Sequence, residues 1–457
     1  MMRPSAISYQ LSSRCRFLAL LGMTTLFVTG SAVAQDKPVQ DKAIVLRGGK
    51  LLTVTHGVIE NGAIVMQDGK IAAIGPASSV NVPSGAQVID VTGMTIYPGL
   101  IDSETQLGLT EISGEEMTND LVEMSDEIMP HMHTAEAFHA ESALIPVARM
   151  NGVTNAVVAP ESGDTLPGQD SFIQLAGANA TEMLLIRDNA MPLNFTGDQR
   201  RNKGGFGARK FPSTRMGLAA QLRQAFLDAQ DYKMKWTDYE RKKADAAQNK
   251  DKDKKSGALP PKRDLKLEAL LPYLDGKKTI VLAAEGPSDL QTAVSLANEF
   301  KLKFVLNHIS HSQPVLDYVA SLKVPVIVGP IYEAPKEDER YDAVYSLPAQ
   351  LYKRGVKIVF ASYSAHNVRN LPDQAGFATA FGLPYEEALK AITINAAEVW
   401  GVADQLGSLD VGKTANVVVA NGDPLDVKTD VKQVFIAGRE VPMTNRQVRL
   451  RDEYSKK

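Results

Sequence analysis

The sequence predicts an α/β protein in which a β segment at each end of the chain flanks a β/α middle. Short apolar or alternating strands occupy residues 43–97, apolar runs alternate with helical stretches from Pro98 onward, and strand character returns after Thr414. Val- and Ile-rich runs bounded by helices are typical of strands buried on both faces of a parallel sheet. We therefore expect the two β segments to pair into one small β domain beside a barrel.

The expected elements follow from this pattern in chain order. Asn61-Gly62 and Asp68-Gly69 are turn signals that separate the first strands. The expected strands are 43–46, 51–54, 63–67, 71–74, 100–101, 153–159, 183–186, 279–283, 304–307, 324–328, 356–361, 415–420 and 431–436. The expected helices are 135–150, 288–300, 313–322 and 385–400.

Two stretches interrupt the alternation. Residues 232–264 contain a lysine-rich run at 250–255 and Pro260-Pro261, which predicts an exposed helix followed by a flexible linker. Acids alternate with the lysines and no aromatic ladder accompanies them, so a solvated insertion is favoured over a site for an acidic partner. The glycine-rich residues 204–207 lack the Lys-Ser/Thr of a phosphate-binding loop and are expected to form a mobile loop.

Residues 1–34 have the pattern of a secretory signal peptide. Arg14 and Arg16 precede the apolar run 17–28, and Ala32-Val33-Ala34 supplies the small residues of a cleavage site. The run is shorter than the ~20 apolar residues of a spanning helix, so we expect cleavage after Ala34 and no membrane anchor. The mature chain is then expected in the periplasm or outside the cell.

Composition narrows the classes of function. The 457 residues include 50 basic and 53 acidic side chains, and without the three arginines of residues 1–34 the formal charge is −6. This balance gives no electrostatic basis for nucleic-acid binding. Cys15, the only cysteine, is removed with the signal peptide. The mature chain is therefore expected to have no disulfide, no thiolate nucleophile and no cysteine metal ligand.

The segment Pro98-Gly99-Leu100-Ile101-Asp102 resembles the amidohydrolase superfamily, in particular its imidazolonepropionase-like branch. Further similar segments lie at 151–154, 307–308, 393–397, 407–416 and 421–424, and the resemblance covers about residues 43–441. It implies a (β/α)₈ TIM-type barrel with a small β-sandwich domain formed by both chain ends. The implied domain boundaries are 35–97 and 404–457 for the β-sandwich and 98–403 for the barrel, with the lysine-rich insertion at about 232–264.

The resemblance also implies a metal-dependent hydrolase of carbon–nitrogen bonds. In such enzymes divalent ions at the carboxyl ends of barrel strands activate a water molecule and polarise the scissile carbonyl. The family's ligands are a His-x-His pair on the first strand, a lysine or acid on the fourth, histidines on the fifth and sixth, and an aspartate on the eighth. The corresponding residues here are Glu104, Gln106, Gln174, Ala283, His308 and Tyr363.

Only His308 matches the family's ligand set. A neutral amide is a poor ligand and alanine is none, and a tyrosine, with an ordinary pKa of about 10, is a poor general base at neutral pH. The sequence therefore predicts that the standard metal centre is lost and that no cofactor is bound. The candidate catalytic residues are Glu104, Glu285, His308 and Tyr363, and the candidate substrate contacts are Gln106 and Gln174.

Two rebuilt sites remain as alternatives. His131-Met132-His133 is the only His-x-His of the chain, and with His308 it would form a three-histidine site for zinc or another divalent metal if it reached the barrel mouth. Glu104, Glu285 and His308 would instead hold a hard cation or act as a metal-free acid and base.

Two functional hypotheses follow. The first is a degenerate binding or partner subunit that takes a small-molecule or peptide-like ligand and forms a homo-oligomer or pairs with an active relative. The second is a hydrolase of non-peptide amides, cyclic amides or dipeptides that uses a rebuilt or metal-free site. A fold alone does not decide between them.

Overall fold

The computed structural model describes residues 42–123, 125–196, 211–248 and 259–455. The expected signal peptide, the glycine-rich residues 204–207 and the lysine run 250–255 lie outside the described residues. Among the residues that are described, no helix combines the length and apolar character needed to cross a membrane.

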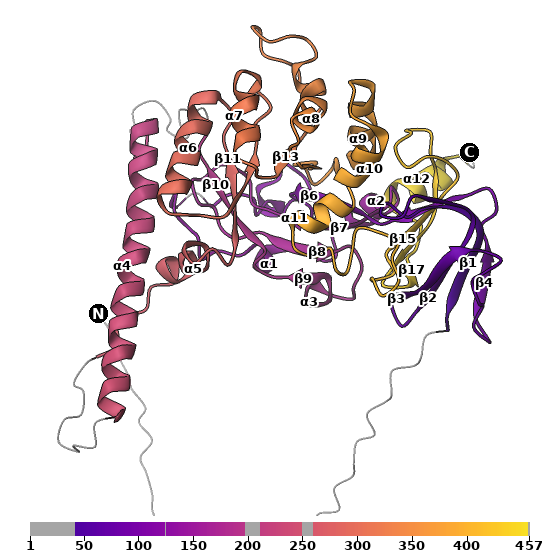
Figure 1. Ribbon diagram of the computed structural model, residues 1–457, viewed down its shortest axis with the longest axis horizontal. Coiled ribbons are helices and arrows are strands. Elements are labelled where there is room, and N and C mark those ends of the chain that lie inside the picture. The colour runs from indigo at the N-terminus through magenta and orange to yellow at the C-terminus, as the bar shows by residue number, and fades with distance from the viewer. Residues whose placement is uncertain (1–41, 124, 197–210, 249–258, 456–457) are drawn as a thin grey trace, which may run out of the picture. The chain divides into compact units, whose positions relative to one another are not determined.

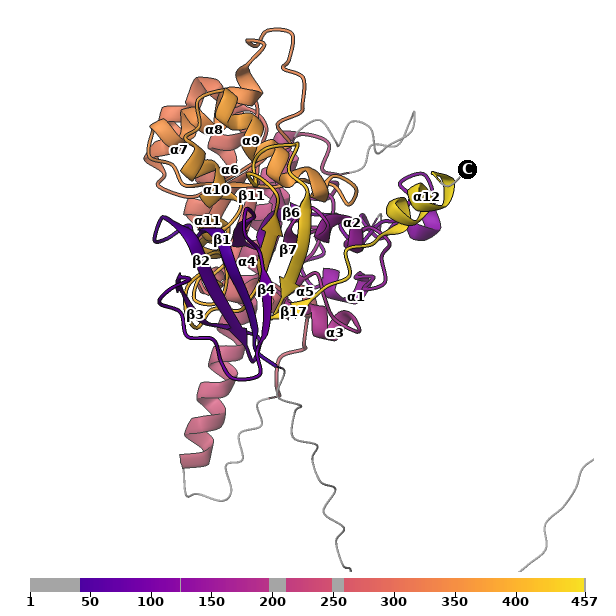
Figure 2. The same cartoon turned by 90° about the vertical axis from the view of Figure 1, so that its right-hand side faces the viewer.

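One sheet draws its strands from both ends of the chain (Figure 1). Its order is β17-β16-β15-β5-β1-β2-β3, and β4 pairs with β1. β15 pairs antiparallel with β5, with Val418 opposite Tyr97. The strands are β1 (Ile44–Leu52), β2 (Val58–Gln67), β3 (Lys70–Pro76), β4 (Gln87–Asp90), β5 (Thr95–Pro98), β15 (Val417–Ala420), β16 (Val431–Ile436) and β17 (Arg439–Glu440). The two ends of the chain therefore share one sheet, which Figure 2 shows with indigo and yellow strands beside each other.

The middle of the chain forms parallel strands. β6 pairs with β7, and β10 to β14 pair in chain order. Ala283 of β11 is in register with Asn194 of β10 and Asn307 of β12, so these three strands end at one level. The parallel strands are β6 (Leu100–Thr105), β7 (Val153–Val158), β10 (Ala190–Asn194), β11 (Thr279–Ala283), β12 (Phe304–Asn307), β13 (Val326–Val328) and β14 (Ile358–Phe360).

One strand of this region runs in the opposite direction. β8 (Ser171–Gln174) is antiparallel to β7 on one side and to β9 (Leu184–Ile186) on the other. The sequence pattern did not predict β8 or β10, and it placed the strand at 183–186 among those of the parallel sheet. That last expectation is wrong, because β9 pairs only along the antiparallel β8.

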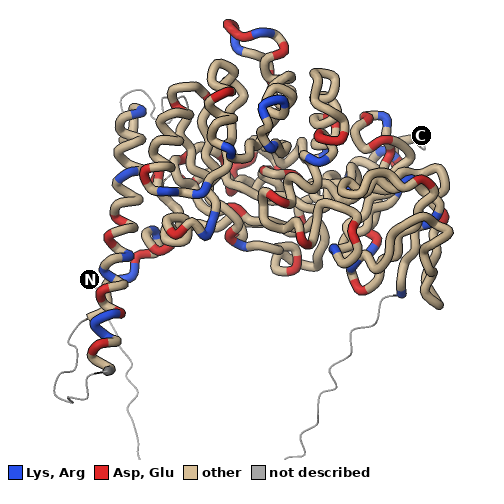
Figure 3. Tube along the Cα trace, viewed as in Figure 1, with Lys and Arg blue, Asp and Glu red and all other residues tan. Residues whose placement is uncertain are grey.

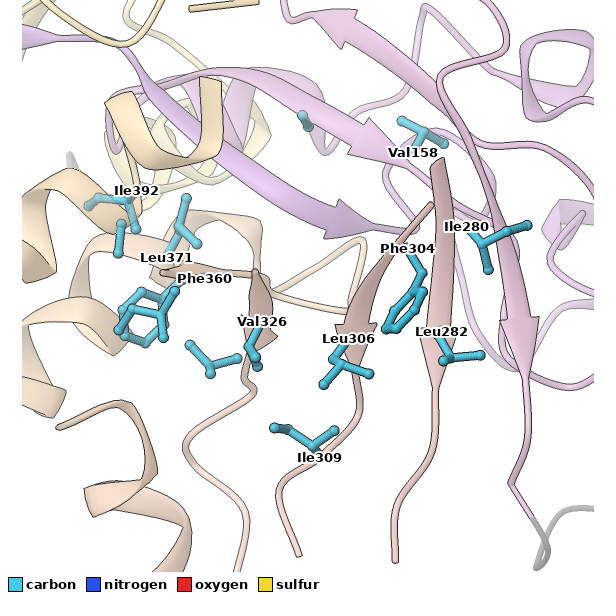
Figure 4. Packing of buried hydrophobic residues seen from close by; sticks show 14 of the residues in the cluster. Val158, Ile280, Leu282, Phe304, Leu306, Ile309, Val326, Phe360, Leu371 and Ile392 are labelled. Carbon is cyan, nitrogen blue, oxygen red and sulfur yellow. The ribbon is translucent and has the colours of Figure 1, made fainter. Parts of the chain in front are cut away.

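A buried cluster joins the strands of the middle region from the inside. Each of β6, β7, β8 and β10 to β14 contributes a side chain to it: Ile101, Val157, Phe172, Ala190, Val281, Val305, Ile327 and Val359. A second layer of apolar side chains fills the space between the strands and the surrounding helices (Figure 4). The strands thus have both faces buried, as their continuous apolar runs predict.

Helices cover the outer faces of these strands. The helices of the described residues are α1 (Thr134–Ala137), α2 (Ile145–Arg149), α3 (Ala180–Met183), α4 (Arg215–Gln248), α5 (Leu265–Leu274), α6 (Pro287–Glu299), α7 (Leu316–Ser321), α8 (Ala343–Lys353), α9 (Leu371–Ala380), α10 (Tyr385–Ala391), α11 (Ile394–Val399) and α12 (Arg446–Tyr454), which buries no residue, with 3-10 turns η1 (Glu116–Thr118), η2 (Gln313–Val315) and η3 (Val368–Asn370). The helices expected at 135–150 and 385–400 are each broken into two, and α8 and α9 were not predicted.

The helix expected in the lysine-rich insertion begins earlier than the sequence suggested. α4 starts at Arg215, and its first half packs on the body through Leu218, Leu222 and Phe226, which are fully buried. Its second half carries alternating charges (Figure 3). Asp238 there pairs with Lys242 at 2.7 Å. This half is a solvated helix surface without an uncompensated basic face.

Gly376 of α9 provides a test of how the carboxyl-terminal segment packs on the barrel helices. A Cβ atom added there would lie 2.2 Å from the main-chain oxygen of Leu425. Gly376→Ala is therefore expected to lower the free energy of unfolding by about 1–3 kcal/mol in urea denaturation, because backbone must move to admit the methyl group. Gly114→Ala, where a Cβ meets open space, is the control. Equal effects of the two substitutions would contradict the contact.

Candidate functional site

A small cavity opens at the carboxyl ends of the parallel strands. Its volume is about 170 Å³. It is lined by Glu104, Thr105 and Gln106 from β6 and the residue after it, Ala159, Pro160, Glu161 and Ser162 after β7, His308 after β12, and Tyr363 after β14. We call it the mouth cavity. The predicted residues Glu104 and Gln106, His308, and Tyr363 come from three distant parts of the sequence, and the fold brings them together here.

Glu104 is the mostly buried carboxyl group of the mouth cavity, whereas Glu161 at its lining is exposed. Glu104 Oε2 accepts a hydrogen bond from Asn307 Nδ2 (2.7 Å), and Glu104 Oε1 lies 4.0 Å from His308 Nε2. Burial raises the pKa of Glu104 to about 8, and the charges of Asp170 and Asp102 add to that effect against the Asn307 hydrogen bond. Glu104 is therefore mostly protonated at neutral pH.

Asn307 connects three groups of the site. Its Oδ1 accepts hydrogen bonds from the His308 main-chain N–H (2.8 Å) and from the Tyr363 phenol. The phenol of Tyr363 thus has a fixed acceptor, and burial with the nearby charge of Glu104 raises its pKa well above the usual value. Tyr363 therefore acts here as a hydrogen-bond donor to Asn307 and is a poor proton acceptor.

His308 and Tyr363 both have positive φ angles, 54° and 49°. Left-handed backbone at a non-glycine residue is unusual and costs about 1 kcal/mol or more. It turns both side chains toward the cavity at the ends of their strands, where the two rings lie with centroids 4.6 Å apart. Burial lowers the pKa of His308 to about 4, so the imidazole is neutral at pH 7.

Two buried aspartates next to the cavity were not predicted as part of the site. Asp102 Oδ1 accepts from the Ser362 N–H (3.0 Å), which ties the first strand β6 to the end of β14. Asp170 Oδ1 accepts from the Ala190 N–H (2.6 Å) at the start of β10. Burial raises the pKa of each to about 7, and the Oδ2 atom of each has no hydrogen-bond partner. Asp102 belongs to the Pro98–Asp102 motif, whereas no sequence pattern marked Asp170.

Glu285 lies outside the lining of the mouth cavity. Its main-chain oxygen accepts from Ser312 Oγ (3.3 Å). Burial raises the pKa of Glu333, which follows β13. The charge of His311 lowers that pKa and the charge of Glu285 raises it further. Glu285 therefore lies near His311 and Glu333. The structure therefore does not place Glu285 with Glu104 and His308 around one cavity.

The predicted position of Gln174 at the mouth is wrong. β8 is antiparallel to β7, so Gln174 pairs with Asn155 near the start of β7, at the end away from the cavity. The side-chain amide nitrogen of Gln174, Nε2, donates to the main-chain oxygen of Glu182 (3.1 Å). The parallel strand that precedes β11 is instead β10, whose carboxyl end carries Asn194.

The alternative three-histidine site is also not formed. His133 Nδ1 lies 2.7 Å from Asp188 Oδ1, and Asp188 precedes β10, whereas His308 follows the opposite, carboxyl end of β12. His131 faces the charges of Lys266 and Asp264 beside α5, and burial lowers its pKa. Within residues 42–123, 125–196, 211–248 and 259–455 no cluster of three or more His, Cys, Asp or Glu side chains could hold a metal ion.

The donors at the mouth cavity do not fit the family's metal centre. Glu104 directs one oxygen to Asn307, Gln106 is a neutral amide, Ala283 has no donor and the Tyr363 phenol is turned to Asn307. Transition metals in hydrolases need at least three imidazole or carboxylate ligands in a compact arrangement. His308, one oxygen of Glu104 and the exposed Glu161 do not form that set, since within the described residues no three such side chains lie close enough together to hold a metal ion.

Comparisons with known proteins define the class. The family model "Amidohydrolase family" matches residues 297–441. The chain is 26% identical over 397 residues to amidohydrolase tasK of Hapsidospora irregularis, covering 83% of this chain and 39% of that protein. It is 25% identical over 407 residues to the imidazolonepropionase of Sphingopyxis alaskensis, covering 81% of this chain and 89% of the relative.

A solved structure extends this likeness to the fold. The amidohydrolase from Thermotoga maritima MSB8 matches with a TM-score of 0.77 and 27% identity, covering 88% of this chain and 100% of that one. The chain belongs to the amidohydrolase superfamily, with the TIM-barrel-type α/β fold that this neighbour implies. Within the superfamily it belongs to the imidazolonepropionase-like branch, which confirms the resemblance found in its motifs.

Proposed function

We propose that this protein is an amidohydrolase-family member that has lost the standard metal centre and acts as a binding or partner subunit for a small ligand. The observation that carries the proposal is the hydrogen-bond chain from Tyr363 through Asn307 to Glu104. This chain links the side chains of Glu104 and Tyr363, which occupy two positions where the family places metal ligands, to each other through Asn307. The mouth cavity of about 170 Å³ supports a small ligand, since a cavity of about 150 Å³ holds benzene.

The proposal includes the architecture and the compartment. The domain is a (β/α)₈ barrel with a β-sandwich from both chain ends, supported by the buried cluster to which each strand of the middle region contributes. The protein is exported to the periplasm or beyond, with cleavage after Ala34. Amino-terminal sequencing of the protein purified from its source tests the cleavage, and an intact Met1 or a different compartment contradicts it.

Metal content is the most direct test of the lost centre. Mature protein dialysed without chelator is expected to retain well below one transition-metal ion per chain, because no three His, Cys, Asp or Glu side chains of the described residues lie close enough together to hold one. Elemental analysis of the wild type and of His308→Ala provides the measurement. Near-stoichiometric zinc that survives dialysis of the wild type and disappears in His308→Ala would refute the proposal.

A second candidate function, metal-free hydrolysis of a carbon–nitrogen bond, is favoured by one observation. Glu104 and His308 lie 4.0 Å apart with their usual pKa order reversed, so that an acid and an unprotonated imidazole coexist at neutral pH. A panel of small amides, cyclic amides and dipeptides decides the point. The panel is assayed with the wild type, Glu104→Gln, His308→Ala and the control His56→Ala, whose side chain is 75% exposed. Activity that survives both cavity substitutions eliminates this candidate.

The partner role has its own test. Gentle affinity isolation of the mature protein from its source is expected to recover a stable complex with an active amidohydrolase relative or with further copies of itself. Recovery as a monomer at physiological concentration counts against a partner subunit and leaves ligand binding as the function.

A further inference from the structure

The amide group of Asn307 has only one orientation that satisfies its neighbours. Two donors, the His308 N–H and the Tyr363 O–H, point at one of its terminal atoms, which must therefore be the acceptor Oδ1. The other terminal atom is then the NH₂ group, and it faces Glu104 Oε2 at 2.7 Å. The orientation of this amide follows from its partners and not from an arbitrary assignment.

This orientation distinguishes the two oxygens of Glu104. Oε2 accepts a hydrogen bond from Asn307, and in a carboxylic acid the carbonyl oxygen is a better acceptor than the hydroxyl oxygen. Among the described residues Oε1 accepts no hydrogen bond, and it lies on the side of His308, which also lines the mouth cavity. A proton carried by Glu104 is therefore placed on Oε1, facing the cavity.

We propose that Asn307 is a positioning residue that, held by Tyr363, fixes Glu104 as a hydrogen-bond donor to the mouth cavity, and that the cavity takes a neutral ligand through a carbonyl oxygen. This inference rests on the proposed ligand-binding function and specifies the chemistry of its ligand. An acceptor oxygen about 2.8 Å from both Glu104 Oε1 and His308 Nε2 fits across the 4.0 Å between them.

The charges around Glu104 support a neutral ligand. The titratable neighbours of Glu104 come from several elements. Asp102 lies on the same strand, Asp170 precedes β8, His308 follows β12 and Tyr363 follows β14. The charge of Glu333, after β13, also raises the pKa of Tyr363. Burial raises the pKa of both aspartates as well as that of Glu104, so adding an anion to this set is unfavourable.

The positioning role is tested on the ligand-free protein by carbon-13 NMR of glutamate labelled at the side-chain carboxyl, with Glu104→Gln to assign the signal. The Glu104 carboxyl is expected to be protonated at pH 7. In Asn307→Leu its pKa is expected to rise further, because the hydrogen bond from Asn307 lowers it in the wild type. The exposed Asn298→Leu on α6 is the matched control and is expected to leave it unchanged.

Tyr363→Phe is the second variant, which keeps the test valid if Asn307→Leu does not fold. Removing the phenol leaves the amide less polarised and a weaker donor, so the pKa of Glu104 is expected to shift upward by a smaller amount. An ionised Glu104 at pH 7 in the wild type overturns the inference. So does an unchanged or lowered pKa of Glu104 in the folded variants.

The ligand chemistry is tested with three small probes: acetamide, 2-pyrrolidinone and acetate. Calorimetric titration at pH 7 is expected to show that the two neutral carbonyl compounds bind at least tenfold more tightly than acetate, and that Glu104→Gln weakens them. Acetate binding as tightly as acetamide overturns the neutral-ligand assignment. Failure of all three probes to bind, with the NMR result as expected, contradicts the proposed binding function and leaves the positioning role of Asn307 supported.

Discussion

Replacing Phe172 by alanine is expected to lower the free energy of unfolding by about 3–5 kcal/mol. Phe172 lies on β8, the one strand of the middle region that runs antiparallel, and its fully buried ring packs in the cluster that joins all these strands. Truncation removes apolar surface and leaves a cavity, since strands from both sides of β8 hold the surrounding residues in place.

Chemical denaturation followed by circular dichroism measures this effect. Leu185→Ala on the neighbouring β9, where the side chain is 46% exposed, is the control and is expected to cost well under half as much. A Phe172→Ala protein as stable as the control would show that β8 does not present Phe172 to the interior. Phe172→Leu is expected to recover part of the loss.

The free energy of unfolding is expected to fall as the pH rises from about 4.5 to about 8. Asp102, Glu104 and Asp170 have folded-state pKa values near 7, 8 and 7, against ordinary values of 3.8, 4.5 and 3.8. In this window the folded protein retains protons that the unfolded chain has lost, so a higher pH favours unfolding. Their contribution is complete below about pH 4 and is lost once the pH passes the folded-state values.

His308 changes the free energy of unfolding in the opposite direction, over a lower pH range. Its pKa falls from 6.5 to about 4 on folding, so between these values the unfolded chain binds the additional proton and stability rises with pH. His308 thus offsets one carboxyl below pH 6.5. The steepest fall is therefore expected between pH 6.5 and about 7, at about 1.4 kcal/mol per pH unit for each titrating carboxyl as an upper limit.

Urea denaturation at half-unit pH intervals measures this profile. Glu104→Gln is expected to remove the decrease in the free energy of unfolding between pH 7 and 8, because Glu104 has the highest of the three pKa values. Glu453→Gln on the exposed α12 controls for a general loss of charge. A stability that is constant or increases from pH 6.5 to 8 would falsify the buried, protonated state of these carboxyls.

The sequence predicted the strands whose apolar runs are long and rich in Val and Ile, and it missed those that break this rule. β10 reads Ala-Met-Pro-Leu-Asn, and Pro192 in its centre has no N–H for a ladder. The structure tolerates the proline because β10 forms a regular parallel ladder only with β11, while its other edge meets the irregular residues 165–170. α8 also contains Pro348 in its interior, which weakened its helical pattern.

The candidate site was predicted in part for a related reason. Glu104, Gln106, His308 and Tyr363 follow strands that motifs place in order, so their convergence could be inferred. Gln174 could not be placed correctly, since counting strands along the chain does not reveal that β8 reverses direction. The link through Asn307 depends on side-chain hydrogen bonds between β12, β14 and β6, which no local pattern encodes.

The pairing of β15 with β5 has a consequence for the order of folding. β5 precedes the barrel and β15 follows it, so the shared sheet cannot be completed until nearly the whole chain has been synthesised. Contacts of such long sequence separation form slowly, because a large loop must close first. Until then the backbone of β5 presents an open edge to other chains. A truncation before Val417 is thus expected to leave a persistent aggregation-prone intermediate, and a chaperone that shields this edge would assist the intact protein.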